Sequence, residues 1–227
     1  MILGIDTSIG TAVAIIADDG AVLAEIVSAD ARGHAEVIGD LIVGALVEVR
    51  RRTGAGARIT AVAAGMGPGP FTGLRVGIAA ANAFALGRGV PLVPVASHDA
   101  AALARVTRLA APSGAASVGA APVEGEPVAI VTDARRRELA VSVYRVEGGL
   151  PVRIEGPRLV ERASTELLDL FGEPASALPE TTAISAVALA RIALARLRAG
   201  EPLGELEPLY LRAPDVTLPA TPKKVGS

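Results

Sequence analysis

The sequence contains no cysteine, few aromatic residues and only two histidines among its 227 residues. Disulfide bonds and thiolate metal sites are therefore excluded, and the composition fits a reducing compartment such as the cytoplasm. A catalytic zinc site normally uses three protein ligands. A third ligand beside His34 and His98 would have to be a carboxylate, and no His-Glu-x-x-His motif is present. We predict that the chain binds no metal of its own.

Long apolar runs are also missing, although hydrophobic residues make up 51% of the sequence. No run approaches the roughly 20 residues that cross a bilayer, and Met1–Asp6 lacks the basic region of a signal peptide. We therefore expect a cytoplasmic protein without a membrane segment. The formal net charge is only −2, which gives no charge pattern for binding nucleic acid alone. Any role with RNA would need a partner.

The most distinctive stretch is residues 65–77, Gly-Met-Gly-Pro-Gly-Pro-Phe-Thr-Gly-Leu-Arg-Val-Gly. It follows a β-leaning apolar run and opens a long apolar segment, so it predicts strand, loop and helix. That order aims backbone N–H groups at an anion, with Thr72 as the expected N-cap. The stretch matches neither the dinucleotide fingerprint, because Pro70 or Thr72 replaces the third glycine, nor a P-loop, because no Gly-Lys pair exists. The spacing alone favours the alternative, a tight connection whose glycines allow close packing.

This run resembles the signature of the bacterial TsaB (YeaZ) family, with Pro70 in place of the usual serine. The segments 133–135 and 208–212 also resemble that family. The resemblance implies the α/β fold of sugar kinases, Hsp70 and actin, which is RNase H-like and has two lobes. It further implies a non-catalytic subunit of the complex that transfers a threonylcarbamoyl group to the adenosine next to the anticodon of tRNA.

We expect an N-terminal actin-like lobe over residues 1–97, a second lobe over 98–212 and a flexible tail over 213–227. Shifting the sequence by 127 positions places Asp133 on Asp6, which suits a fold made of two similar lobes. The first lobe should contain strands at 2–7, 11–17, 21–28 and 90–96, and helices at 34–52 and 72–88, before a helix at 97–110. The second should contain strands at 128–133, 139–143 and 150–160 and helices at 164–171 and 182–199. Residues 111–127 read as a flexible insertion, and the strand that the family usually carries between 171 and 183 is truncated.

In the actin-like fold the first hairpin clasps a nucleotide phosphate and its aspartate lies near the metal. The resemblance therefore implies these candidate nucleotide-facing residues: Asp6, Thr7, Ser8, Thr11, Gly67, Gly69 and Asp133. The alternative is that Asp6 and Ser8 simply hydrogen-bond the turn, as Asp and Ser commonly do. We expect no cofactor for the isolated chain, with ATP and magnesium bound only within a complex.

The helices at 34–52 and 72–88 are apolar on more than one face. In the first, Val43 and Val47 lie opposite the stripe that would face the core. A helix that is apolar all round is either buried or shares a face with a partner, and a small lobe can cover few such helices. We predict a partner surface, packed as a two-plus-two helix bundle, that contains His34, Val43, Gly44, Val47, Thr72, Arg75, Gly77, Ala80 and Phe84.

The resemblance implies a TsaD-type catalytic paralogue as the partner, with a TsaE-type ATPase in the same complex and tRNA contacted only indirectly. A homodimer through the same helices is the alternative assembly. The paralogue is implied to bind metal through a His-x-x-x-His pair, and here that location reads His98 to Ala102, whose methyl group cannot coordinate. We therefore predict no catalytic residues. Two other functions stay open: an autonomous ATPase or small-molecule kinase using Asp6 and Asp133, and a peptidase, which lacks any catalytic constellation.

Overall fold

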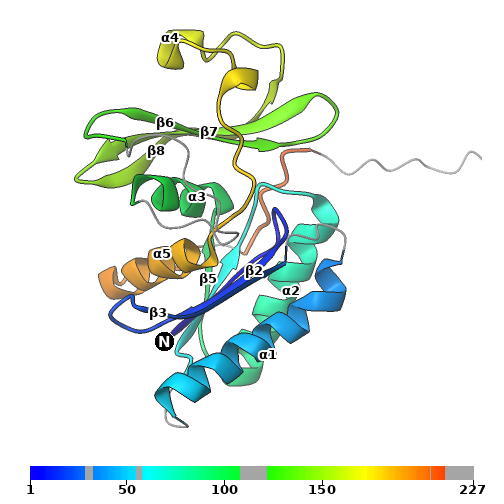
Figure 1. Ribbon diagram of the computed structural model, residues 1–227, viewed down its shortest axis with the longest axis vertical. Helices are drawn as coiled ribbons and strands as arrows, with labels where there is room; N and C mark the ends of the chain where they lie inside the picture. The colour runs from blue at the N-terminus through cyan, green and yellow to red at the C-terminus, as the bar shows by residue number, and fades with distance from the viewer. Residues whose placement is uncertain (29–32, 55–57, 108–121, 205, 213–227) are drawn as a thin grey trace, which may run out of the picture.

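The computed structural model describes residues 1–28, 33–54, 58–107, 122–204 and 206–212. Its first sheet has five strands in the order β3-β2-β1-β4-β5 (Figure 1). The strands β1 (Ile2–Asp6), β2 (Thr11–Ile16) and β3 (Val22–Ser28) form an antiparallel meander, and β4 (Ala61–Gly65) and β5 (Leu92–Val95) run parallel to β1. Because β1, β2 and β4 are buried along their whole length, they read as continuous apolar runs rather than alternating ones.

Helices α1 (His34–Thr53) and α2 (Phe71–Arg88) lie side by side on one face of the first sheet (Figure 1). Both predicted helices are confirmed to within one residue. Thr72 is not the N-cap, however, because Pro70 takes that position and its carbonyl accepts the Leu74 N–H at 3.0 Å. The basic residues in the last turn of α1 suit the negative end of the helix dipole.

The opposite face of the first sheet is covered by α5 (Ala186–Ala199), and α3 (Ser97–Val106) packs between α5 and the second sheet. The predicted helix starting at residue 97 is confirmed but ends earlier, at Val106. α5 is the last helix among the described residues, and its small buried residues pack on β1 and β2. Alanine at these positions lets the helix approach the strands closely. Within the described residues, no helix combines the length and the apolarity needed to cross a bilayer.

The second sheet is an antiparallel meander of β6 (Pro127–Asp133), β7 (Glu138–Glu147) and β8 (Leu150–Glu161). It repeats the topology of β1-β2-β3, and Asp133 ends β6 as Asp6 ends β1. Its outer face is covered by α4 (Leu168–Phe171) and a 3-10 turn (Ala175–Ala177). A counterpart of β4 is reduced to one parallel bridge between Val131 and Glu180, as the truncation in the sequence suggested.

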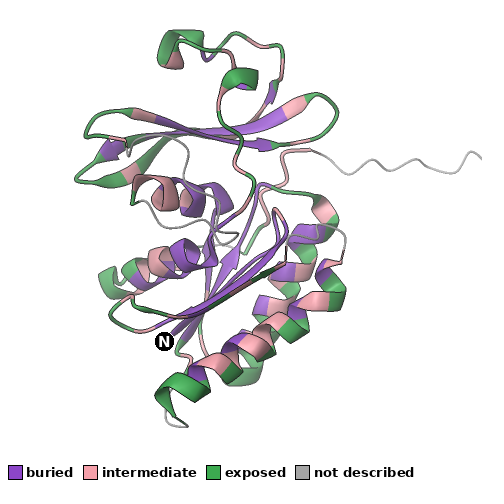
Figure 2. Cartoon of the chain, viewed as in Figure 1, coloured by how far each residue is buried: buried purple, intermediate pink, exposed green. Residues whose placement is uncertain are grey.

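One hydrophobic core lies between the two sheets. It joins side chains of β1, β2, β4 and β5 to α3 and α5, and it continues to Ile130, Tyr144 and Val146 of the second sheet. Buried segments of both sheets face this region (Figure 2). α5 therefore packs on the first sheet although it follows the second sheet in sequence. Most of the expected insertion at 111–127, and the whole expected tail at 213–227, lie outside the described residues.

Candidate functional site at the glycine stretch and the junction of the two sheets

The glycines of residues 65–77 pack directly against the turn between β1 and β2. A Cβ atom added at Gly65 would overlap the carboxylate of Asp6, and one at Gly77 would overlap the hydroxyl of Thr7. A Cβ atom added at Gly69 would lie 2.8 Å from the Cα of Ser8, closer than real side chains allow. Alanine cannot fit these positions without a shift, so the glycines are needed for this close packing against the turn between β1 and β2.

The carboxylate of Asp6 is buried and fully engaged inside the protein. The backbone N–H and the hydroxyl of Ser8 donate to one carboxylate oxygen at 2.8 and 2.6 Å, and the hydroxyl of Ser97 donates to the other at 2.5 Å. The Ser97 oxygen also accepts the N–H of Gly67 at 3.0 Å. Burial raises the pKa of Asp6, although these hydrogen bonds act in the opposite direction. This network links the hairpin to the glycine stretch and to the start of α3.

The other polar residues of the hairpin also have partners inside the chain. The hydroxyl of Thr7 donates to the carbonyl of Gly73 at 2.7 Å, and the hydroxyl of Thr11 lies 2.8 Å from Nδ1 of His34. All of these side chains are buried. A phosphate could reach them only if the glycine stretch moved away, so the contacts favour the structural interpretation of Asp6 and Ser8.

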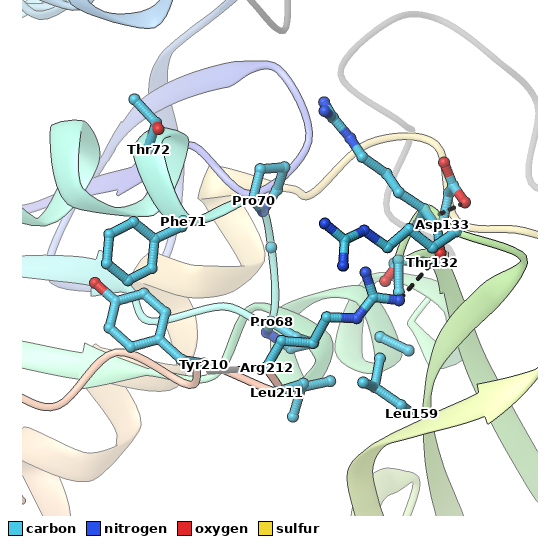
Figure 3. A pocket seen from close by; sticks show the side chains of 15 residues that line it. Pro68, Pro70, Phe71, Thr72, Thr132, Asp133, Leu159, Tyr210, Leu211 and Arg212 are labelled. Carbon is cyan, nitrogen blue, oxygen red and sulfur yellow. Dashed lines mark hydrogen bonds between the residues drawn. The ribbon is translucent and has the colours of Figure 1, made fainter. Parts of the chain in front are cut away.

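A pocket of about 430 Å³ lies next to the glycine stretch, between the two sheets (Figure 3). Gly69 and Asp133 are both in its lining, whereas Gly67 is buried and is not. Asp133 forms an ion pair with Arg162 at 3.0 Å and accepts the N–H of Arg135 at 3.1 Å. Partial burial acts to raise the pKa of Asp133, but Arg162 and Arg135 hold it below its usual value.

The turn that follows Asp133 has an unusual backbone. Arg135, Arg136 and Arg137 have φ angles of 62°, 52° and 65°, in the left-handed region that non-glycine residues rarely adopt. Each such residue costs on the order of 1 kcal/mol and persists where neighbouring contacts hold it. Arg212 provides such contacts, because it donates to the carbonyl of Arg135 and pairs with Glu138.

Arg212 belongs to the closing segment, residues 206–212, which lies across the glycine stretch. The N–H of Leu209 donates to the carbonyl of Met66 at 2.7 Å, and the ring of Tyr210 lies 4.5 Å from that of Phe71. The guanidinium of Arg75 stacks 3.7 Å above the Phe71 ring, and its Nε donates to the Tyr210 hydroxyl at 3.1 Å. The closing segment therefore ties the glycine stretch to the second sheet.

His98 holds the second sheet against the start of α3. Its ring is fully buried, with Nδ1 2.8 Å from the Ser142 hydroxyl and Nε2 3.1 Å from the Thr132 hydroxyl. Burial, together with the charge of Arg153, lowers the pKa of His98 to about 3. No carboxylate contacts the ring in the described part of the chain, so the arrangement is not a nucleophilic triad.

The residue after His98 extends the same junction. The Asp99 carboxylate accepts from the hydroxyl of Tyr144 at 2.8 Å and pairs with Arg153 at 3.3 Å. Among the described residues no three His, Cys, Asp or Glu side chains converge in a way that could hold a metal ion. Ser97, Thr132 and Ser142 were not among the predicted site residues. Ser142 is a polar residue within an apolar stretch, and Ser97 and Thr132 each end an apolar run, which is a usable signal.

The predicted partner surface divides by exposure. Val43 and Val47 are 58% and 61% exposed on α1, and Leu86 on α2 is 74% exposed; α1 and α2 form one outer layer (Figure 2). The prediction that Val43 and Val47 face away from the core is confirmed. The other candidates are exposed (Thr72 and Arg75), partly buried (Gly44, Ala80 and Phe84) or buried (His34 and Gly77).

Two glycines in that set have their close neighbours within the same chain. A Cβ atom added at Gly44 would lie 2.9 Å from the side chain of Ile26 on β3, and one at Gly77 would meet Thr7. Arg75 is likewise held by Phe71 and Tyr210. Gly44 and Gly77 are therefore explained by packing within this chain, without a partner helix.

A family model described as TsaD, tRNA N6-adenosine threonylcarbamoyltransferase, matches residues 15–194. A Mycobacterium tuberculosis protein without an assigned function is 33% identical over 226 residues, covering 94% of this chain and 92% of that protein. A tRNA N6-adenosine threonylcarbamoyltransferase of Streptococcus suis is 36% identical over 111 residues, covering 42% of this chain and 32% of that enzyme. Among solved structures, YeaZ from Pseudomonas aeruginosa superimposes with a TM-score of 0.68 at 23% identity, covering 92% of this chain and 99% of that one.

Proposed function

Because the chain belongs to the family of TsaD, the tRNA N6-adenosine threonylcarbamoyltransferase, and has the actin-like fold of YeaZ, we propose that it is the non-catalytic TsaB-type subunit of the threonylcarbamoyl-transfer complex. The protein takes part in tRNA modification. In this proposal it binds a TsaD-type catalytic paralogue in the cytoplasm, and a TsaE-type ATPase joins the same complex. The observation that carries the proposal concerns the hairpin of β1 and β2. Its Asp6 carboxylate accepts hydrogen bonds from the hydroxyls of Ser8 and Ser97 and is buried, so it does not face a ligand.

Two further features support a role without catalysis. Ala102 is buried where the resemblance implies a second metal ligand, and its methyl group offers no lone pair. His98, the remaining histidine of that motif, already uses both ring nitrogens on Ser142 and Thr132. A His ring engaged on both sides, with no carboxylate beside it among the residues that the structure describes, cannot serve as a general base without rearrangement.

Partner binding is supported by the outer layer of α1 and α2. Val43 and Val47 lie one turn apart on α1, and neither contributes to the hydrophobic core beneath the helix. Exposed apolar side chains at i and i+4 form a continuous stripe along a helix. Such a stripe fits the face of another helix, which is how a two-plus-two bundle is built.

The variant Val47→Glu should separate partner binding from folding. Because Val47 is exposed, the thermal transition of the isolated chain should hardly change, whereas the affinity for the catalytic paralogue should fall by about 2 kcal/mol or more if the side chain is a central anchor. The measurements are a melting curve and titration calorimetry with the purified paralogue. The matched control is Val123→Glu, because Val123 is 67% exposed and lies away from α1. A large loss of stability with unchanged affinity would contradict the proposed surface.

The alternative function is an autonomous ATPase, favoured by the pocket between Gly69 and Asp133. We expect the purified chain, incubated with ATP and magnesium, to show no hydrolysis near ~1 per second, the low end of enzyme rates. The variant Asp133→Asn is the appropriate control because Asp133 is exposed and its replacement should leave the fold intact. Partner-independent hydrolysis at that rate, lost in Asp133→Asn, would replace the scaffold proposal with the ATPase.

A further inference from the structure

A second pocket, of about 820 Å³, lies at the end of the first sheet where β1, β4 and β5 begin, opposite the end that carries the glycine stretch. It is lined by Met1, Thr60 and Pro91, which lie just before β1, β4 and β5, and by the last turns of α1 and α2. Leu46, Val49 and Val90 contribute apolar walls. Three arginines, Arg50, Arg58 and Arg88, complete the lining, and we call this site the basic pocket.

The basic pocket carries positive charge that the chain does not neutralise. No acidic residue is among its described lining residues, and in the described ranges none of its three arginines forms an ion pair. The neighbouring Arg51 and Arg52 differ, because both pair with Glu48, at 2.8 and 2.6 Å. The terminal ammonium of Met1 is also neutralised, by Asp18 at 2.7 Å.

Favourable interaction with helix dipoles explains the positions of only two of these three arginines. Arg50 and Arg88 lie in the last turns of α1 and α2, where a cation stabilises the helix. Arg58 lies between α1 and β4, outside any helix, so the dipole gives no reason for its charge at this place. Its position brings a third arginine to the lining of the same pocket.

The chemistry of the lining indicates the ligand. Guanidinium groups suit phosphate oxygens, which they can bind with two parallel hydrogen bonds. The described lining includes no aromatic ring on which a base could stack and no side-chain amide that could read a base edge. Such a surface contacts phosphates without recognising the bases.

We propose that the basic pocket binds the phosphodiester backbone of tRNA held by the assembled complex. This inference rests on the proposed function and changes one expectation from the sequence, namely that the chain contacts tRNA only indirectly. The net charge of −2 is compatible with it, because a few local phosphate contacts add to binding that the catalytic paralogue supplies. The isolated chain should bind RNA weakly.

The test compares two double variants in the complex with the catalytic paralogue. Arg58→Gln with Arg88→Gln removes two charges from the pocket. Arg137→Gln with Arg145→Gln removes two exposed charges, one from the turn before β7 and one from β7. The affinity for tRNA is measured over a series of salt concentrations. Each lost phosphate contact lowers the magnitude of the slope of log K against log salt by about 0.7 to 0.9. The pocket variant should therefore lose about 1.4 to 1.8, and the control variant should keep the parent's slope.

Melting curves and co-elution with the paralogue accompany both variants. A reduced slope with unchanged melting and co-elution supports the basic pocket. An unchanged slope in the pocket variant, or an equal decrease in the control, overturns the inference while leaving the proposed function intact. Loss of co-elution in the pocket variant would mean that the pocket binds protein, which also overturns it. Failure of the parent chain to assemble with the paralogue would instead overturn the proposed function.

Discussion

The variant Gly77→Ala should lower the free energy of unfolding by about 2 kcal/mol, the usual cost of overpacking a buried site. Alanine is the better helix former by roughly 1 kcal/mol, so helix propensity alone predicts the opposite sign. The added methyl group would overlap the hydroxyl of Thr7, which is buried and donates to the carbonyl of Gly73. Moving Thr7 away would break that hydrogen bond. Urea denaturation of parent and variant measures the effect.

The same helix provides a matched control. Gly87 also lies within α2, and a Cβ atom added there meets no atom within 4 Å. Gly87→Ala should therefore raise the free energy of unfolding by about 0.5 to 1 kcal/mol. Adding Thr7→Ala to Gly77→Ala should recover part of the loss, because it removes the atoms that overlap. If Gly77→Ala is as stable as the parent, the packing of Gly77 against Thr7 is looser than these contacts indicate.

Replacing His98 by alanine should lower the free energy of unfolding by about 4 kcal/mol. The change leaves a cavity in a close-packed junction and removes the partner of two buried hydroxyls, those of Ser142 and Thr132, each of which costs about 1 to 3 kcal/mol when unsatisfied. His98→Gln is the second, milder variant. Its amide can reach one of the two hydroxyls, so it should be destabilised less.

The same histidine predicts a dependence of stability on pH. The pKa of His98 is about 3 in the folded protein and about 6.5 in an unfolded chain. Between these values only the unfolded chain binds the proton, so the free energy of unfolding falls as the pH falls below 6.5. The loss is roughly 2 kcal/mol by pH 5. Urea denaturation of parent and His98→Gln at pH 7 and pH 5 measures it. An equal loss in both proteins would assign the dependence to other groups.

Local patterns predicted much of the first lobe. The periodicity of α1 placed Val43 and Val47 on the outer side, where the structure has them exposed. The order of strand, loop and helix around the glycine stretch was also correct, because it depends on neighbouring residues only. The predicted start of α2, residue 72, was wrong by one residue. The predicted N-cap was wrong by two, because Pro70 and not Thr72 takes that position.

Contacts between residues that are far apart in the sequence could not be predicted from local patterns. Ser97 binds Asp6 across 91 positions, and no spacing rule connects them. The neighbour of Gly77 is Thr7, so a glycine that the sequence assigned to a partner helix is explained within the chain. The packing of α5 on the first sheet also lacks a local signal, because an apolar helix reads the same whichever sheet it covers.

The position of α5 has a consequence during synthesis. The first sheet is complete once β5 has emerged from the ribosome, but the helix that covers one of its faces begins at Ala186, after residues 96–185 have been added. At about 5 to 20 residues per second this interval lasts roughly 5 to 20 s. During that time the nascent chain carries uncovered apolar strands. A chain truncated before α5 would keep them exposed and should be a target for chaperones or proteases.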